Sequence, residues 1–274
     1  SPSRSSLLSG RLPFHVQQIN QQNCDLSQGV NASMTFISQQ LKKAAYETVH
    51  VGKWHLGYSE ELHPMELGFE HFTGLLGGSR SYFPKLEKRP SKAQRIERDG
   101  VEVAESEFEY VTDLFTEEAC RLVRERDPER PLFMYLSYTA PHGPMHARAD
   151  LFERFSGIEV EKRRKYAAMV SAMDEGIGRL LETLDAEGMT EDTMVVFLSD
   201  NGGILRHGSS NAPLRGEKGQ YLEGGIRVPA FFSGGFTERT LARNGIAPHV
   251  SKVLTHITDI HATLLSIAGA ALPR

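Results

Sequence analysis

The sequence alternates short apolar runs with longer segments whose apolar residues lie three or four positions apart, and this alternation constrains the fold more than any other feature. The apolar runs predict strands within residues 47–57, 131–140, 193–200 and 226–232. The helical spacing predicts a helix after Ser33 and helices over about 3–10, 110–126, 160–187 and 255–269. Strands that alternate with helices favour an α/β fold, with a mostly parallel sheet flanked by helices on both faces.

One region departs from this alternation. Residues 59–108 are rich in glycine, proline and charge and follow neither the helix nor the strand period. We therefore expect a surface insertion or hairpin region there. No internal repeat or low-complexity tract divides the rest of the chain.

Composition argues against several kinds of partner. The formal net charge is −4 and no basic block outweighs the acids around it, so we expect no nucleic acid partner. No run reaches the ~20 apolar residues of a membrane-spanning helix, so we expect no transmembrane segment. The two cysteines make neither a disulfide framework nor a zinc cluster. We expect Cys120 to be a buried thiol, Cys24 to lie in a polar loop with its partner unassigned, and Asn31 to carry a glycan only in a eukaryotic secretory protein.

Polar clusters follow the predicted strands, and ligands of parallel sheets bind beyond the carboxyl ends of the strands. After the strand at 193–200, Asp200 and Asn201 precede two glycines. Carboxylate and amide oxygens are hard ligands that suit Ca²⁺ or Mg²⁺. The alternative is an Asx-type turn that binds no metal. A divalent ion needs more oxygens than this pair offers, and we expect the remaining ligands to lie upstream of Ser1.

Positively charged and titratable side chains gather at the same strand ends. Lys53 and His55 lie two positions apart, so in an extended segment both point the same way. His142 lies in a loop stiffened by prolines, Arg4 begins the first helix, and Lys218 lies in a glycine-flanked loop. Such a set fits a tetrahedral oxyanion ester, since each cation about 4 Å away contributes on the order of 4 kcal/mol at an effective dielectric near 20. These residues alone allow a phosphatase or a sulfatase equally.

Longer motifs in these clusters resemble the type I sulfatases of the alkaline-phosphatase superfamily. The family signature runs from Cys or Ser through Pro-Ser-Arg and Leu to Thr-Gly-Arg, and residues 2–11 are similar to it, with Ser9 where Thr is usual. A second family signature resembles AYETVHVGKWHLG (45–57), with Ala45 in place of glycine. Three further segments resemble family motifs, the last of them typical of the arylsulfatase B-like subgroup: SDNGG (199–203), RGEKGQYLEGGIRVP (215–229) and RRKYAAMVSAMDEGIG (163–178).

The resemblance implies a nucleophile and a metal ion. The family oxidises a Cys or Ser to formylglycine, and that residue is expected just before Ser1, outside this chain. Arg4 would hold the formylglycine hydrate, and Asp200 and Asn201 would complete a Ca²⁺ site, with Mg²⁺ the less favoured ion. A formylglycine-generating or equivalent maturation enzyme is the implied partner.

The resemblance also implies roles around the sulfate group. Lys53 and Lys218 would bind sulfate oxygens. His142 would protonate or hydrogen-bond the leaving ester oxygen, and so would also touch substrate. His55 would take the proton from the remaining formylglycine hydroxyl so that sulfate is released. This is covalent catalysis assisted by electrostatic stabilisation of the charged group.

The function expected from the resemblance is hydrolysis of a sulfate monoester, with a sulfated small molecule or glycan as substrate. Residues 1–274 would form an incomplete sulfatase catalytic domain that lacks the N-terminal strand and the C-terminal subdomain, and the fragment would be inactive. Family members are secreted, periplasmic or lysosomal, and the compartment of this one stays open. Two alternatives remain: a phosphate or phosphonate ester hydrolase on the same fold, and a non-catalytic protein that binds sulfated glycans.

Overall fold

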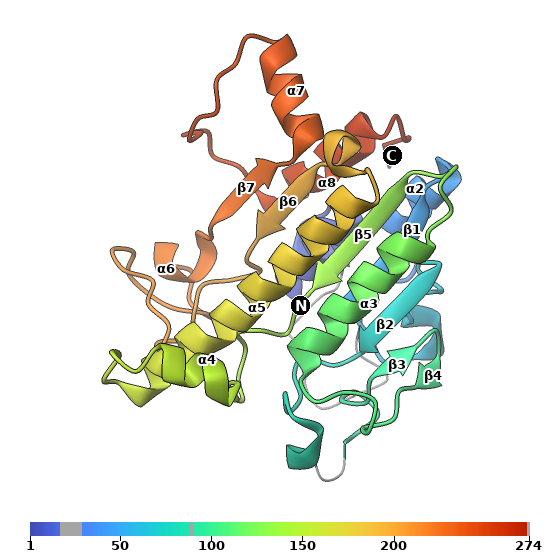
Figure 1. Cartoon of the computed structure of the whole chain (residues 1–274). Helices are drawn as coiled ribbons and strands as arrows, with labels where there is room; N and C mark the ends of the chain where they lie inside the picture. Colours follow the sequence, from blue (N-terminus) through green and yellow to red (C-terminus); the bar gives the residue numbers. More distant parts are fainter. Residues whose placement is uncertain (17–28, 88–89, 273–274) are drawn as a thin grey trace. The chain divides into compact units, whose positions relative to one another are not determined.

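The computed structural model describes residues 1–16, 29–87 and 90–272. Cys24, whose partner the sequence left unassigned, lies outside the described residues. The chain divides into two compact units, residues 1–146 with 255–274, and residues 147–254. Figure 1 traces both units, and each is described here by itself.

The first unit is built on a mixed sheet of five strands in the order β4-β3-β2-β1-β5. Strand β1 runs parallel to both of its neighbours, β2 and β5, with Lys53 opposite Leu75 and Gly52 opposite Ser137. The other neighbours, β2 with β3 and β3 with β4, pair antiparallel. The strands are β1 (Glu47–Lys53), β2 (His71–Leu75), β3 (Glu97–Arg98), β4 (Val101–Glu102) and β5 (Leu132–Ser137).

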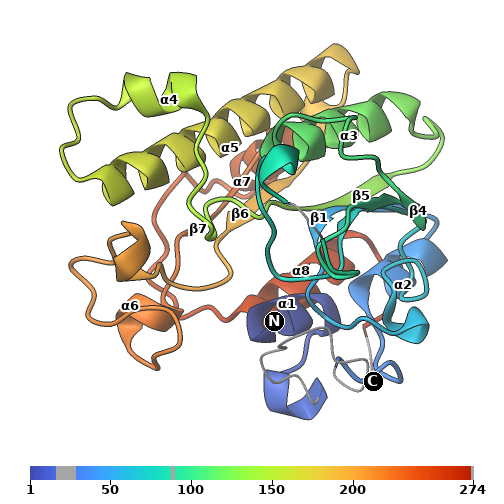
Figure 2. The ribbon, with the colours of Figure 1, turned by 90° about the horizontal axis from the view of Figure 1, so that it is seen from below.

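Helices cover both faces of this sheet (Figure 2). The long helix α3 (Val111–Glu125) lies on one face, while α1 (Pro2–Ser9), α2 (Ile37–Lys43) and α8 (Ile257–Ile267) lie on the other. The buried core on that second face includes the side chains of Trp54, Phe36, Phe69, Phe72 and Leu265. The α/β fold expected from the sequence is confirmed, and its sheet is mixed rather than wholly parallel.

The region 59–108 is not merely a surface insertion. It contains β2, the central strand of the sheet, which pairs directly with β1, and its side chains Leu62, Phe69 and Phe72 are buried. The expected hairpin is present, since β3 and β4 pair antiparallel. The 3₁₀ helices η2 (Glu60–Leu62) and η3 (Pro84–Leu86) belong to the same region, while η1 (Pro13–Val16) follows α1. The short strand His71–Leu75 was missed because its few residues lie among glycines and charges.

The second unit contains a two-stranded antiparallel sheet and the longest helix. The strands expected at 193–200 and 226–232 and the helix expected at 160–187 are present, although the two strands pair antiparallel instead of parallel. The helices that precede the sheet are α4 (Ala149–Arg154), α5 (Glu161–Ala186) and η4 (Thr190–Asp192). The remaining elements are β6 (Val195–Leu198), η5 (Leu205–His207), α6 (Glu223–Ile226), β7 (Ala230–Ser233) and α7 (Gly235–Arg243).

In the described part of the chain, no helix is long and apolar enough to cross a membrane. Cys120 is a free, buried thiol on α3, as expected from the sequence.

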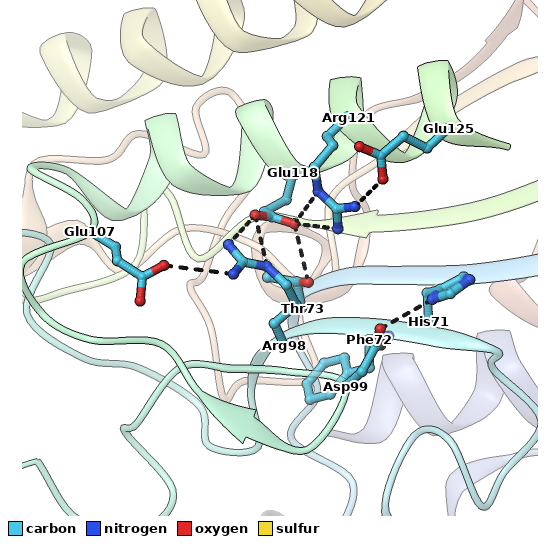
Figure 3. Close-up of polar contacts among 9 residues, drawn as sticks. All are labelled: His71, Phe72, Thr73, Arg98, Asp99, Glu107, Glu118, Arg121 and Glu125. Atoms are coloured by element: carbon cyan, nitrogen blue, oxygen red, sulfur yellow. Dashed lines mark hydrogen bonds and ion pairs between the residues drawn. The ribbon is translucent and has the colours of Figure 1, made fainter.

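An ion-pair network fastens α3 to the sheet (Figure 3). The carboxylate of Glu118 is nearly buried and bonds the guanidinium groups of Arg98 on β3 and Arg121 on α3. Its second oxygen lies 3.5 Å from the Thr73 hydroxyl on β2, and Arg121 continues the network to Glu125. Burial alone would raise the pKa of Glu118, but the hydrogen bonds from Arg98 and Arg121 outweigh it and hold that pKa below its ordinary value.

We expect Glu118→Gln to lower the free energy of unfolding at pH 7 by about 2 kcal/mol, because hydrogen bonds to a charged group are lost. Since folding depresses the pKa of Glu118, its contribution is present above pH 4.5 and is lost as pH falls toward the folded pKa. The difference between the variant and the wild type should therefore shrink in acid. This difference in the free energy of unfolding is measured by urea denaturation. Unfolding is followed by the fluorescence of Trp54, the single tryptophan of the sequence.

Glu125→Gln is the matched control, because it removes a carboxylate from the 60%-exposed end of the same network. An exposed pair contributes less than about 1 kcal/mol. Equal losses for the two variants would contradict the role assigned to Glu118.

Candidate active site

Two of the expected site residues meet at the carboxyl end of β1. Lys53 is the last residue of the strand, and both Lys53 and Arg4 are buried. The Arg4 Nη1 atom donates to the Lys53 carbonyl oxygen at 2.9 Å and to the Tyr135 hydroxyl at 3.0 Å. The helix α1 ends at Ser9 and is capped by Gly10 in the left-handed conformation, so the chain leaves the helix less than two turns after Arg4. The structure thus joins α1, β1 and β5 through one guanidinium group.

The glycine before Lys53 is required by the packing of β1 against β5. Gly52 has a φ of +113°, and a Cβ at this position would lie 2.2 Å from the Ser137 carbonyl oxygen. Only glycine accepts both the backbone conformation and the close approach. Gly52 therefore allows β1 to pack closely against β5 directly before Lys53, the last residue of the strand.

His55 lies beyond the strand in a conformation that the sequence did not predict. An extended segment would point Lys53 and His55 the same way, but the strand ends at Lys53 and His55 has a φ of +63°. Its backbone N–H donates to the Leu76 carbonyl at 3.0 Å. A Cβ on Gly78 would lie within 2.8 Å of the imidazole atoms Cε1 and Nε2, so this glycine makes room for the ring. A left-handed non-glycine residue is backbone strain of the kind often found at functional sites.

His142 lies in the loop that follows β5. Its Nδ1 donates to the Gly143 carbonyl at 2.7 Å, so proton exchange with a ligand would take place at Nε2. The buried Tyr82 donates its hydroxyl to the His142 carbonyl at 2.9 Å. Four residues later, the His146 carbonyl accepts from the Tyr110 hydroxyl at 3.0 Å. No pattern in the sequence indicates that Tyr82 and Tyr110 hold this loop.

The other expected site residues lie in the second unit. Asp200 and Asn201 follow β6, as the strand pattern predicted. The Asn201 Nδ2 donates to the Gly202 carbonyl at 3.0 Å, which leaves Oδ1 as the oxygen suited to a cation. The backbones of Gly202 and Gly224 approach so closely that a Cβ on Gly202 would lie 1.8 Å from the Gly224 oxygen. The glycines after Asn201 therefore allow the backbone to make a tight turn.

Asn211 ties the Lys218 loop to this turn. Its side chain donates to the carbonyls of Gly203 and Gly216 and accepts from the Gly203 N–H. The Lys218 N–H also donates to the Gly203 carbonyl, at 3.3 Å. The structure thus brings Lys218 and the Asp200–Asn201 turn together within one unit. Asn211 was not among the residues expected from the sequence.

Positive charge concentrates around the same loop. Burial lowers the pKa of His207, and the charges of Arg206, Lys218 and Lys162 lower it further. Such a group of cations attracts an anion more strongly than any one of them alone.

A metal site is not complete within the described residues, where no three His, Cys, Asp or Glu side chains gather as ligands. Asp200 and Asn201 offer two hard oxygen donors, which is chemically suited to Ca²⁺ but below its usual coordination of six to eight.

An α/β domain with cations gathered at its strand ends is an architecture suited to oxyanion esters. The family model described as Sulfatase matches residues 1–270, and the chain belongs to the sulfatase family.

Among its relatives, mouse (Mus musculus) arylsulfatase J is 35% identical over 98% of this chain and 44% of its own length. Human (Homo sapiens) N-acetylgalactosamine-6-sulfatase is 30% identical over 100% of this chain and 53% of its own length. The crystal structure of Ps i-CgsB in complex with k-i-k-neocarrahexaose has a TM-score of 0.88 and 34% identity, and the match covers 99% of this chain and 62% of that one. The chain spans about half the length of the curated relatives it matches.

We expect Gly52→Ala to destabilise the protein by about 2–4 kcal/mol, because the new methyl group combines a strained φ with overlap against β5. Gly178→Ala in α5 is the control, since a Cβ there meets nothing within 4 Å. It should stabilise the helix by about 0.5–1 kcal/mol. Denaturation followed by circular dichroism measures both, and a neutral Gly52→Ala would contradict the close approach of β1 and β5.

Proposed function

We propose that the protein containing this chain hydrolyses a sulfate monoester on a sugar. The observation that carries the proposal is the meeting of Arg4 and Lys53 at the end of β1, in a chain that the sulfatase family model matches over residues 1–270. Two cations held at one strand end favour a compact, fully ionised oxyanion.

Lys53 and Lys218 bind the sulfate oxygens in this proposal. Both are compact ammonium charges that neutralise the anion and the charge that develops on it in the transition state. The partial positive charge at the amino end of α1 acts in the same direction. Arg4 forms two hydrogen bonds within the protein, so its guanidinium is held in place before any ligand arrives.

The bond-breaking steps use the two histidines. A formylglycine hydrate, in the motif position that precedes Ser1, would supply the oxygen that attacks sulfur, and Arg4 would orient that residue at the start of α1. His142, protonated on both ring nitrogens, would donate its Nε2 proton to the ester oxygen as the S–O bond breaks and the alcohol leaves. His55 would accept a proton from the remaining formylglycine hydroxyl as the C–O bond to sulfate breaks and sulfate is released.

Asp200 and Asn201 would hold a Ca²⁺ ion in the proposed site, through a carboxylate oxygen and Oδ1. When bound, such an ion would add positive charge next to the sulfate group. Mg²⁺ is the less favoured occupant, because its compact octahedral site retains several waters.

The names of the relatives support a substrate class. One relative is named for N-acetylgalactosamine, and the structural neighbour Ps i-CgsB was solved with k-i-k-neocarrahexaose. We therefore propose a sulfated sugar as substrate, such as a sulfated galactosamine unit or an algal galactan. Maturation of the nucleophile calls for a formylglycine-generating or equivalent enzyme.

Lys218→Ala in the full-length protein should lower kcat/KM for a sulfated sugar by about 10²-fold or more, because a charge that stabilises the transition state is removed. Lys162→Ala is the control, since Lys162 lies in the same charged neighbourhood of His207 but has no proposed contact with substrate. Sulfate release measured by ion chromatography gives both values. Equal losses of kcat/KM in the two variants would mean that the loss comes from the change in net charge. An unchanged kcat/KM in Lys218→Ala would show that Lys218 is not part of the site.

Asp200→Ala should abolish the increase in Tm that Ca²⁺ gives the full-length protein, because a ligand that binds only the folded state stabilises it. Glu159→Ala, which removes an exposed carboxylate from the same unit, should leave that increase unchanged. Differential scanning calorimetry with Ca²⁺ or with a chelator measures the shift. Its persistence in Asp200→Ala would show that the metal assignment is wrong.

A further inference from the structure

His50 is an unusual residue for the middle of a buried strand. It lies on β1 with none of its surface exposed. Its ring stacks on Phe72 and Tyr135, each with a centroid separation of 4.9 Å, and lies near Trp54 and Phe69. Burial, with a smaller contribution from the positive charge of Arg4, holds the pKa of His50 well below its ordinary value. The imidazole is therefore neutral. The space around it would also accommodate an apolar ring.

Hydrogen bonds give this histidine a defined orientation. The Ser137 Oγ lies 2.8 Å from the Lys53 carbonyl oxygen and 2.9 Å from the His50 Nε2. A carbonyl oxygen can only accept, so the serine proton points to Lys53 and the Ser137 Oγ accepts from His50 Nε2–H. This fixes the tautomer and leaves Nδ1 as a bare lone pair.

The fixed tautomer lowers the stability of the core. Within the described part of the chain, the His50 Nδ1 is buried without a hydrogen-bond partner. An unsatisfied buried polar atom costs about 1–3 kcal/mol. A phenyl ring would avoid that cost and keep the stacking, so packing alone does not explain a histidine here.

The hydrogen bonds close into a ring around Lys53. The Lys53 carbonyl accepts from both Ser137 and Arg4, and Arg4 also bonds the Tyr135 hydroxyl. Tyr135 in turn stacks on His50. Four side chains from α1, β1 and β5 therefore fix one peptide group, and that peptide carries the proposed sulfate-binding lysine.

We propose that His50 and Ser137 are positioning residues, which orient the Lys53 peptide and the Arg4 guanidinium for the anion. This inference rests on the proposed function, because it assigns Lys53 and Arg4 to the sulfate site. Neither His50 nor Ser137 touches substrate. Their effect passes through the hydrogen bond from His50 to Ser137 and from Ser137 to the Lys53 carbonyl.

The test compares variants of the full-length protein in one assay of kcat/KM, with the Kd of inorganic sulfate measured by calorimetry. Ser137→Ala and His50→Phe should each lower kcat/KM about 10-fold to 10²-fold, since small misplacements of binding groups have effects of that size. The double variant should lose no more than Ser137→Ala alone, because both residues act through one chain of bonds. His50→Gln keeps an N–H donor and should recover much of the loss.

Stability separates positioning from a merely structural role. His50→Phe removes the buried bare Nδ1 and retains the aromatic packing, so its Tm should equal or exceed that of the wild type while activity falls. Ser38→Ala is the matched control, because Ser38 is another fully buried serine whose hydroxyl donates to a carbonyl, that of Leu67 at 2.5 Å. It should leave kcat/KM and the sulfate Kd unchanged.

The outcomes keep the two proposals distinct. If Lys53→Ala abolishes activity while Ser137→Ala and His50→Phe retain wild-type kcat/KM, the positioning role is overturned and the sulfatase proposal stands. If the wild type hydrolyses no sulfate ester but binds sulfate, weaker binding by Ser137→Ala and His50→Phe upholds positioning without catalysis. Unchanged binding by those variants overturns it, and a wild type that neither hydrolyses nor binds sulfate overturns both proposals.

Discussion

The carbonyl oxygen of Lys53 is the point on which the described site depends. It accepts from Arg4 on α1 and from Ser137 on β5, and it belongs to the last residue of β1. Because both donors are buried, water does not compete well with these bonds, and each is stronger than it would be at the surface. One peptide group therefore joins a helix and two parallel strands at the edge of the sheet where anions are expected to bind.

The sequence was sufficient to predict the helices and strands that position this site. Periodicity placed β1, β5 and the long helix α5 correctly, and the glycine after Ser9 marked the end of α1. It did not place β2, because five residues that include a histidine, a threonine and a glycine form no clear apolar run. The alternation of strands with helices predicted parallel strands, so the antiparallel pairing of β6 with β7 was not foreseen.

The site was predictable in its charged residues and not in their supports. Arg4, Lys53 and Lys218 stand out because cations next to glycines and strand ends are conspicuous in a sequence. Tyr82 gives no such signal, since its bond to the His142 carbonyl joins residues 60 positions apart. His50 looked like part of a strand, and its role depends on a serine 87 positions away. His55 likewise has a left-handed conformation, with its ring against Gly78, that its place in the sequence does not indicate.

The central claim is that the end of β1 forms part of a sulfate site. A crystal structure of the full-length protein with bound sulfate, located by anomalous scattering from sulfur, tests it most directly. The account predicts a sulfate oxygen within about 3 Å of the Lys53 Nζ, the length of a charge-assisted hydrogen bond. Sulfate bound at another place, with no contact to Lys53, would contradict it.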